Sequence, residues 1–309
     1  MRDVESGESA RSDWAVVRAS GEPLAADPAR GQRLPDGAVI AGKYVVRRVI
    51  GRGSGSTVYH GEQLSIGRQV AIKVRASVQK GSEQHQRLVR EARLLAELAD
   101  ESLVRVFDLG WLEVGTGAVV MELLEGETLR ERLRRVGAMP PDELLPLMVD
   151  ALEGLATVHA QRIVHRDLRP ANLFLANKRD GLFLKIIDFG LGRALDDANR
   201  LTALGQVLGT PAYMAPEQFL RTTSVDERAD LYSVGVTLYE ALVGRAPFLG
   251  NAAELPLRIL RDTPPPARSV RPELSPELEA FLSKSIARSA ADRFQSAAEM
   301  ADALRRLSG

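Results

Sequence analysis

Short runs of β-branched and other apolar residues, separated by glycines and polar residues, dominate the chain between residues 43 and 74. Runs of this kind are typical of strands joined by tight turns, and three of them, 44–50, 57–59 and 69–74, are predicted to pair as antiparallel strands. Two more strand-like runs follow at 103–109 and 118–121. Together they predict a small β-rich lobe, 41–122, that ends at Glu122.

Helical patterns appear within and after this β-rich region. From 88 to 98, apolar residues and one carboxylate, Glu91, recur at spacings of three and four and therefore share one helix face. Residues 142–159 repeat the pattern, although Pro146 weakens the first turns, and 231–243 is apolar nearly all round, as in a buried helix. Serines at 275 and 296 are typical of helix N-caps, the second with a capping-box glutamate. The pattern predicts an α+β chain whose larger lobe, 123–309, is mainly helical.

Residues 1–40 lack such regularity. They mix Gly, Ser, Pro, Ala and charged residues, with little hydrophobic periodicity apart from a short apolar patch at 14–17. We interpret them as a mostly disordered leader that precedes the folded part, 41–309.

Composition narrows the classes of function. Lys and Arg number 41, as do Asp and Glu, so neither a nucleic-acid partner nor an anionic membrane is indicated. The absence of cysteine excludes disulfides, catalytic thiols and thiolate zinc sites, and four scattered histidines disfavour a histidine metal site. No apolar run approaches the ~18 residues of a spanning helix, and the first thirty residues lack a signal-peptide pattern. We therefore expect no membrane span and a cytoplasmic location.

The first candidate site residues lie in the β-rich part. Glycines at 51, 53 and 55 join the first two strands, where backbone amides can approach phosphate oxygens, although such a hairpin is also an ordinary turn. Lys73 lies on the third strand among apolar neighbours, where an ammonium group requires an anionic partner. Glu91 is the candidate partner. The alternative is a lysine at a strand edge that reaches solvent.

Two motifs carry the second group of candidates. One is His165-Arg166-Asp167-Leu168-Arg169-Pro170-Ala171-Asn172, and the other, Asp188-Phe189-Gly190, begins 21 residues after Asp167. Two acidic residues and an amide on loops between strand-like segments suit oxygen ligation of magnesium beside a base for a hydroxyl group.

The order of these motifs resembles that of the eukaryotic-like serine/threonine protein kinases, from about Lys43 to Leu307. The resemblance implies a two-lobed kinase fold, ATP and Mg²⁺ as cofactors, and protein substrates phosphorylated on Ser or Thr. The catalytic group it implies comprises Asp167 as the base, Lys73 paired with Glu91 on the α/β-phosphates, and Arg169 at the transferring phosphoryl group. Asn172 and Asp188 would hold magnesium. The residues implied to enclose or contact the nucleotide are Ile50, Gly51, Gly53, Val58, Ala71, Lys73, Met121 as gatekeeper, Glu122 and Leu124 through their backbones, and Phe174.

The same resemblance extends to residues 209–217, which look like a substrate-docking loop followed by an Ala-Pro-Glu segment. It implies that Glu217 pairs with Arg293 and that Asp230 holds the catalytic-loop backbone. Thr210 before a proline favours Ser/Thr over Tyr as the acceptor. Thr202 is expected to be autophosphorylated, through self-association, and clamped by Arg166.

Three departures from the family pattern bear on rate and helix positioning rather than on the type of reaction. Ser56 occupies the place of the third loop glycine, Arg169 replaces a lysine, and 98–103 lacks the usual His-Pro-Asn turn. Two alternatives stay open. A pseudokinase scaffold usually lacks a residue equivalent to Lys73, Asp167 or Asp188, all of which are present. A small-molecule phosphotransferase generally lacks the full Ala-Pro-Glu segment.

Overall fold

The computed structural model describes residues 13–14, 16–17, 33–53, 56–75, 96–112, 116–178, 181–188, 211–220, 225–251 and 253–308. Its contacts divide the chain into two compact units. The first comprises Met1–Val89 and Val106–Leu123, and the second comprises Arg90–Arg105 and Leu124–Gly309. No helix among the described residues is long and apolar enough to cross a membrane.

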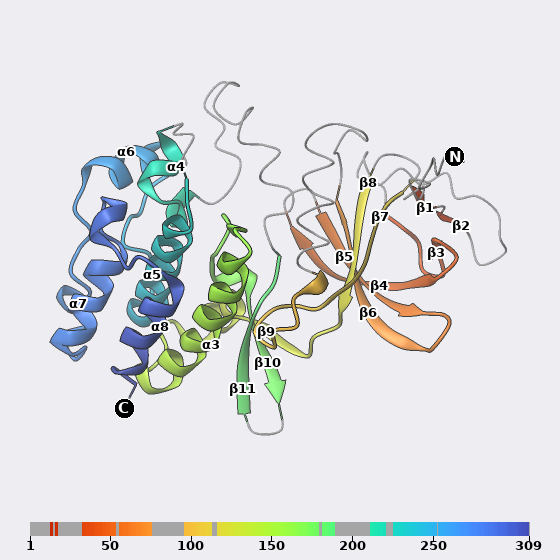
Figure 1. Cartoon of the computed structure of the whole chain (residues 1–309), viewed down its shortest axis with the longest axis horizontal. Coiled ribbons are helices and arrows are strands. Elements are labelled where there is room, and N and C mark those ends of the chain that lie inside the picture. The colour runs from red at the N-terminus through yellow and green to blue at the C-terminus, as the bar shows by residue number, and fades with distance from the viewer. Residues whose placement is uncertain are drawn as a thin grey trace, which may run out of the picture. The chain divides into compact units, whose positions relative to one another are not determined.

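The first unit is built on a single β-sheet (Figure 1). Its strands are β1 (Asp13–Trp14), β2 (Val16–Val17), β3 (Val39–Ile40), β4 (Tyr44–Gly53), β5 (Ser56–Gln63), β6 (Arg68–Arg75), β7 (Val106–Leu112) and β8 (Thr116–Glu122). They lie in the order β1-β7-β8-β6-β5-β4-β3-β2, and only the β1–β7 pair is parallel. The three strands predicted between residues 44 and 74 are confirmed as β4, β5 and β6, in antiparallel register.

The hydrophobic core of the first unit lies on one face of this sheet. Val70, Ile72 and Val74 alternate along β6 and are at most 4% exposed, and Ala118 and Val120 of β8 are fully buried beside them. Because successive strand residues point to opposite faces, Ala71 and Lys73 occupy the other face. This alternation decides where the candidate nucleotide residues lie.

The predicted leader is wrong at its C-terminal end. Leu34, Ala38 and Ile40 are buried in the core of the first unit, at most 4% exposed, and β3 pairs with β4. The backbone N–H of Leu34 donates to the hydroxyl of Tyr59 (3.1 Å), which fixes this segment against β5. Further upstream, β1 and β2 coincide with the apolar patch at 14–17. The signal was weak because each of these strands spans only two residues, which is too short for any periodicity.

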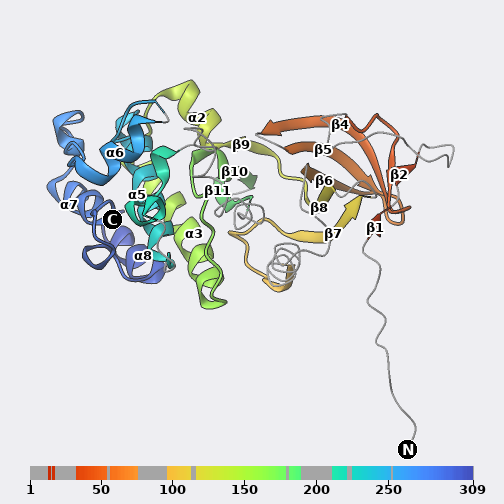
Figure 2. The ribbon, with the colours of Figure 1, turned by 90° about the horizontal axis from the view of Figure 1, so that it is seen from above.

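The second unit combines a small sheet with helices (Figure 2). The sheet has the order β11-β10-β9, with β9 (Gly126–Thr128), β10 (Leu173–Lys178) and β11 (Gly181–Ile186). The helices are α2 (Leu129–Val136), α3 (Pro141–Ala160), α4 (Pro216–Phe219), α5 (Arg228–Val243), α6 (Glu254–Arg261), α7 (Pro276–Ser285) and α8 (Ala297–Arg305), and the short 3₁₀ turns are Pro170–Asn172, Pro211–Tyr213, Ala267–Ser269 and Ala290–Asp292. Helix α3 packs against α8 and β11.

Helix α5 forms the centre of the second unit. Fourteen of its sixteen residues are buried, as its apolar sequence predicts. It can approach α7 closely because Gly235 has no side chain: a Cβ there would lie 2.6 Å from the Cβ of Ser285. Ser275 caps α7 as predicted. Ser296 caps α8, but Glu299 reaches the backbone of Gln295 instead of closing the predicted capping box.

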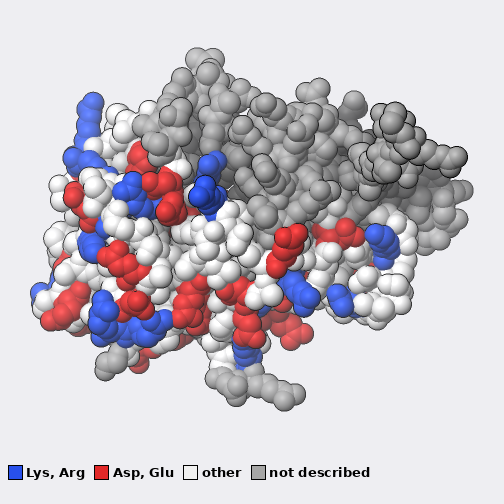
Figure 3. Space-filling view, viewed as in Figure 1, with Lys and Arg blue, Asp and Glu red and all other residues white. Residues whose placement is uncertain are grey.

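The two units differ from the two predicted lobes at residues 90–105. These residues were predicted to lie in the β-rich lobe, but they belong to the second unit. Backbone hydrogen bonds explain the difference, because Val104 N donates to Ile186 O (3.0 Å) and Ile186 N donates to Ser102 O (2.7 Å). The strand predicted from residue 103 therefore begins at Val106. Both signs of charge are interspersed over the described part of the face in Figure 3, in keeping with the balanced composition.

Candidate active site

A β-hairpin brings two of the candidate metal ligands to the same end of the small sheet. Leu173 of β10 pairs with Ile186 of β11, so Asn172 before β10 and residue 187 after β11 are neighbours. The backbone N–H of Ile187 donates to Asn172 O (2.9 Å). Asp188, the next residue, therefore lies beside Asn172, which the 15 residues between them in sequence did not guarantee.

The catalytic-loop candidates are joined to this hairpin by hydrogen bonds. Asn172 is 3% exposed, and its Nδ2 donates to the backbone oxygen of Asp167 (2.7 Å). The Nε of Arg169 lies 3.5 Å from Oδ1 of Asp167. Both side chains are partly exposed, so the Asp167 carboxylate is positioned by its loop and remains accessible at the surface of the second unit.

His165 supports Asp167 from within the protein. Its ring is fully buried; Nδ1 accepts a hydrogen bond from the backbone N–H of Asp167 (3.2 Å), and Nε2 lies 3.4 Å from the carbonyl of Ile187. These partners suit a neutral ring with its proton on Nε2. Burial lowers the pKa of His165, against the opposing influence of the carboxylates of Asp230 and Asp167.

This depressed pKa predicts a loss of stability in acid. A histidine whose pKa is lower in the folded than in the unfolded state contributes stability above the unfolded pKa of ~6.5 and loses it as the pH falls, at most about 1.4 kcal/mol per pH unit. We expect His165→Phe to unfold in urea with a smaller difference between pH 7.5 and pH 5.5 than the wild type. An unchanged difference would show that His165 takes up its proton equally in both states.

Asp230 holds the other end of the loop. Its carboxylate, at the start of α5, is fully buried and accepts hydrogen bonds from the backbone N–H groups of His165 (2.7 Å) and Arg166 (2.8 Å), and its Oδ2 lies 2.9 Å from Nε2 of His159. The predicted role of Asp230 in holding this backbone is confirmed.

Asp230→Asn should lower the free energy of unfolding by about 1–3 kcal/mol, because an amide nitrogen replaces one accepting oxygen and leaves a buried N–H without a partner. Urea unfolding followed by circular dichroism measures the change. The matched control is Asp226→Asn, a more exposed aspartate whose side chain accepts hydrogen bonds from the nearby Arg228, where we expect less than about 1 kcal/mol. Equal losses in the two variants would contradict the role of Asp230.

Backbone strain marks the same loops. Among the described residues other than glycine, only Ala41, Arg162, Arg166 and Asp188 have positive φ, and the last two flank the candidate catalytic group, at 62° and 60°. Such conformations cost of order 1–3 kcal/mol each and persist where surrounding bonds enforce them. Asp230 supplies that enforcement at Arg166.

The side-chain oxygen atoms of Asn172 and Asp188 suit the binding of a magnesium ion. The hydrogen bond from Nδ2 of Asn172 to Asp167 orients the amide, so Oδ1 of Asn172 is the atom that can bind a metal ion. Asp188 contributes a carboxylate. No cluster of three His, Asp or Glu side chains suited to a metal occurs in the described part of the chain. Mg²⁺ is usually bound by one or two protein oxygens together with phosphate oxygens and water, and Asn172 and Asp188 offer such oxygens.

Four candidate residues of the first unit share the sheet face opposite its core. Cross-strand register places Val58 opposite Lys73 and Ala71 opposite Met121. Because paired residues of adjacent strands point to the same side, these four side chains gather on one face. Ala71 is 6% and Met121 is 9% exposed, so Lys73 projects from an apolar surface.

The glycine-rich residues lie where β4 turns into β5. Gly51 pairs with Val58 and Gly53 with Ser56, which leaves a two-residue connection, and Ile50 falls at an irregularity in the register. Glu122 ends β8 in the first unit, whereas Leu124 belongs to the second unit and Phe174 lies on β10 opposite Lys185. Glu91, Thr202 and Thr210 lie outside the described residues, so the Lys73–Glu91 pair and the phosphorylation of Thr202 stay predictions.

One buried polar cluster was not predicted. Arg130 of α2 donates through Nη1 to Glu240 of α5 (2.8 Å) and through Nη2 to the hydroxyl of Tyr213, which itself donates to Glu240 (2.5 Å). Burial, reinforced by Glu240, raises the pKa of Tyr213. Arg130 is separated from its partners by 83 and 110 residues, and no local pattern signals such a contact. The cluster ties the Pro211–Tyr213 turn to α2 and α5.

Comparison with known proteins decides the family. The model of the protein kinase domain matches residues 44–304. The chain belongs to the protein kinase family. Its fold agrees, since the crystal structure of the PknI kinase domain of Mycobacterium tuberculosis superposes with a TM-score of 0.72 at 26% identity, over 89% of this chain and 99% of that one.

Three curated relatives of this kinase-family chain come from bacteria. Serine/threonine-protein kinase pkn2 of Myxococcus xanthus is 40% identical over 283 residues, which cover 87% of this chain and 33% of the relative. PknB of Mycobacterium leprae is 36% identical over 87% of this chain and 44% of the relative. PknL of Mycobacterium tuberculosis is 39% identical over 87% of this chain and 67% of the relative. The chain thus spans between about a third and two thirds of the length of these kinases.

Proposed function

We propose that this chain is a serine/threonine protein kinase that transfers the γ-phosphoryl group of MgATP to Ser or Thr side chains of proteins. The observation that supports it most directly is the placement of Asp167, Asn172 and Asp188 at one hairpin end, where Asn172 bonds Asp167 and Ile187 and Asp230 holds the backbone of residues 165 and 166. Relatives named serine/threonine-protein kinases at 36–40% identity support the same assignment.

The proposed mechanism depends on position and charge more than on covalent chemistry. Asp167 accepts the proton of the substrate hydroxyl at its carboxylate, which Arg169 contacts and the loop orients. Lys73 binds the α- and β-phosphates, with Glu91 as its partner, and the glycines at 51 and 53 let backbone amides approach the phosphates. Asn172 and Asp188 would hold a magnesium ion, which would neutralise charge at the phosphates when bound.

The adenine would lie against the apolar face of the first sheet, where Val58, Ala71 and Met121 gather, beside Ile50 and the backbone of Glu122. The opposite, core face of the sheet offers no such surface, because its side chains pack against one another. A pseudokinase scaffold is disfavoured because Lys73, Asp167 and Asp188, one of which such a scaffold usually lacks, are all present in the chain.

Phosphate transfer from labelled ATP to a generic protein substrate tests the proposal. With Mg²⁺ present we expect label on the polypeptide, and hydrolysis should release phosphoserine or phosphothreonine. Chelation of the metal should abolish transfer. Label that never leaves ATP would support a scaffold, label on a small molecule alone would support another class of phosphotransferase, and phosphotyrosine would contradict the acceptor.

A further inference from the structure

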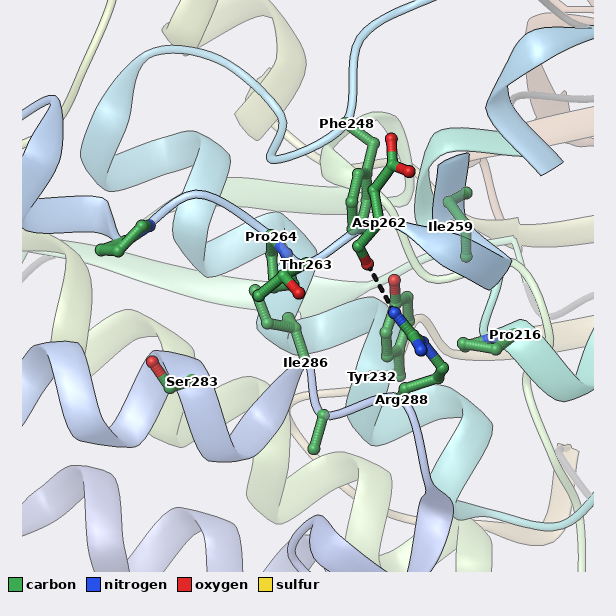
Figure 4. Close-up of a pocket in the computed structure, with 12 residues that line it drawn as sticks. Pro216, Tyr232, Phe248, Ile259, Asp262, Thr263, Pro264, Ser283, Ile286 and Arg288 are labelled. Carbon is green, nitrogen blue, oxygen red and sulfur yellow. Dashed lines mark hydrogen bonds between the residues drawn. The ribbon is translucent and has the colours of Figure 1, made fainter. Parts of the chain in front are cut away.

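A pocket of about 450 Å³ lies in the second unit, and none of its lining residues belongs to the loop and hairpin of residues 165–188 (Figure 4). Its inner wall is apolar, with Tyr232, Phe248, Ile259 and Ile286 each at most 6% exposed. The volume lies in the range of ~300–1,000 Å³ that is typical of binding pockets. Such a wall offers a place for an apolar group that arrives from outside.

One cation is fixed at this pocket. Nη2 of Arg288 donates to the backbone oxygens of Arg261 (2.8 Å) and Asp262 (2.9 Å) at the C-terminal end of α6. A guanidinium group has five N–H donors, so Nε and Nη1 lie outside these two bonds. Asp262, the only acidic residue of the lining, presents its carbonyl to Arg288, and in Figure 4 its carboxylate points away from the guanidinium.

The elements around the pocket also carry exposed apolar side chains. Among the described residues of the second unit, five large apolar side chains are exposed, and three of them, Leu220, Leu249 and Leu257, lie outside the lining but within four residues of a lining residue. Leu220 follows α4, which begins at the lining residue Pro216, and Leu257 lies on α6. Apolar groups gathered beside a polar rim mark surfaces that bind proteins.

The pocket continues from the segment expected to contact the substrate. Pro216 follows the Pro211–Tyr213 turn by three residues, a span of at most ~11 Å even when fully extended. A polypeptide bound along that turn could therefore place a nearby side chain in the pocket. A protein substrate is the occupant that this continuity favours over a small molecule.

We propose that the pocket docks protein substrates through a segment in which an apolar side chain stands next to Asp or Glu. The apolar side chain fills the space against Phe248 and Ile259, and the carboxylate accepts hydrogen bonds from Arg288. The last turn of α6 also carries two basic residues, Arg258 and Arg261, which add to the positive charge of Arg288. This inference rests on the proposed function, since it names a class of substrate for the proposed kinase.

Direct binding tests the proposal without ATP. The ligand is the fluorescein-labelled peptide Gly-Glu-Asp-Leu-Phe-Asp-Glu-Gly, measured by fluorescence anisotropy against the full chain. Two variants alter the pocket: Ala287→Trp fills it, and Arg288→Gln removes the charge but keeps an amide donor for the α6 carbonyls. Arg306→Gln, an exposed arginine beyond α8, is the matched control. Two further peptides serve as ligand controls. One has Ser in place of Leu and Phe, and the other has Gln and Asn in place of Glu and Asp.

We expect each pocket variant to weaken binding of the acidic, apolar peptide about tenfold, the scale of one lost charge-assisted hydrogen bond, and Arg306→Gln to change it less than about twofold. The wild type should bind each of the two substituted peptides about tenfold more weakly than the acidic, apolar peptide. Equal affinities across variants, no binding at about 1 mM peptide, or preference for the serine peptide would overturn the proposal. So would sedimentation showing a wild-type dimer that Ala287→Trp dissociates, because the occupant would then be a second copy.

These outcomes are separable from those of the kinase assay. If the chain binds the peptide but transfers no phosphate, the docking site stands and the proposed activity fails. If it phosphorylates proteins and binding is indifferent to the pocket, the activity stands and the docking site fails. Asp167→Asn should leave peptide binding unchanged in either case.

Discussion

Asp167→Asn should reduce kcat for phosphate transfer by about 10²–10⁴-fold, the range attributed to a positioned general base. The substitution removes the group that accepts the hydroxyl proton and leaves a side chain of nearly the same shape. The two hydrogen bonds of its backbone with the loop, Asp167 N to His165 and Asp167 O to Asn172, survive the change, whereas the contact of its carboxylate with Arg169 loses its charge attraction. The loss should therefore appear in kcat, with KM for ATP within about twofold of the wild type.

Steady-state kinetics with labelled ATP measure both constants. The control is Asp142→Asn, an exposed aspartate in the first turn of α3, which should keep wild-type rates. A variant Asp167→Asn that retains full activity would remove Asp167 from the reaction. A variant with normal kcat and raised KM for ATP would place Asp167 in nucleotide binding instead.

The sequence could predict strand-like segments beside the candidate metal ligands because those signals are local, as in the apolar run that precedes Asp188. The pairing of Leu173 with Ile186, which leaves Asn172 beside residue 187, joins two such segments and was shown only by the structure. The alternation of apolar residues around Lys73 likewise predicted β6, although only the register with β5 and β8 showed which face the lysine occupies.

Contacts between residues that lie far apart in the sequence could not be predicted in this way when no hydrophobic pattern marks either residue. Arg130 on α2 looks like any charged residue of an amphipathic helix, and nothing near it indicates a partner on α5. The burial of Leu34 depends on the hydroxyl of Tyr59, 25 residues away. In both cases the partner is chosen by tertiary packing, which local propensity does not encode.

The largest stability effect is expected at Arg293. Its side chain is fully buried, with Nη1 and Nη2 donating to the two carboxylate oxygens of Glu217 (2.7 and 2.8 Å), which confirms the predicted pair. Its remaining donors bond the carbonyls of Ala287, Arg228 and Arg288. Glu217→Gln should lower the free energy of unfolding by about 3–5 kcal/mol, because a buried guanidinium then lacks its counter-ion.

A double-mutant cycle separates the pair from its surroundings. We expect Glu217→Gln and Arg293→Met together to cost about 1–3 kcal/mol less than the sum of the single changes, since neither charge is then left buried alone. The comparison pair is Lys284–Glu299, which has a similar distance (2.9 Å) but side chains that are 43% and 44% exposed, and its coupling should stay below about 1 kcal/mol. Urea unfolding followed by far-UV circular dichroism reports on the helices that both pairs join. Equal coupling in the two cycles would mean that burial does not strengthen the Glu217–Arg293 pair, and that the carbonyl bonds of Arg293 alone hold this part of the second unit.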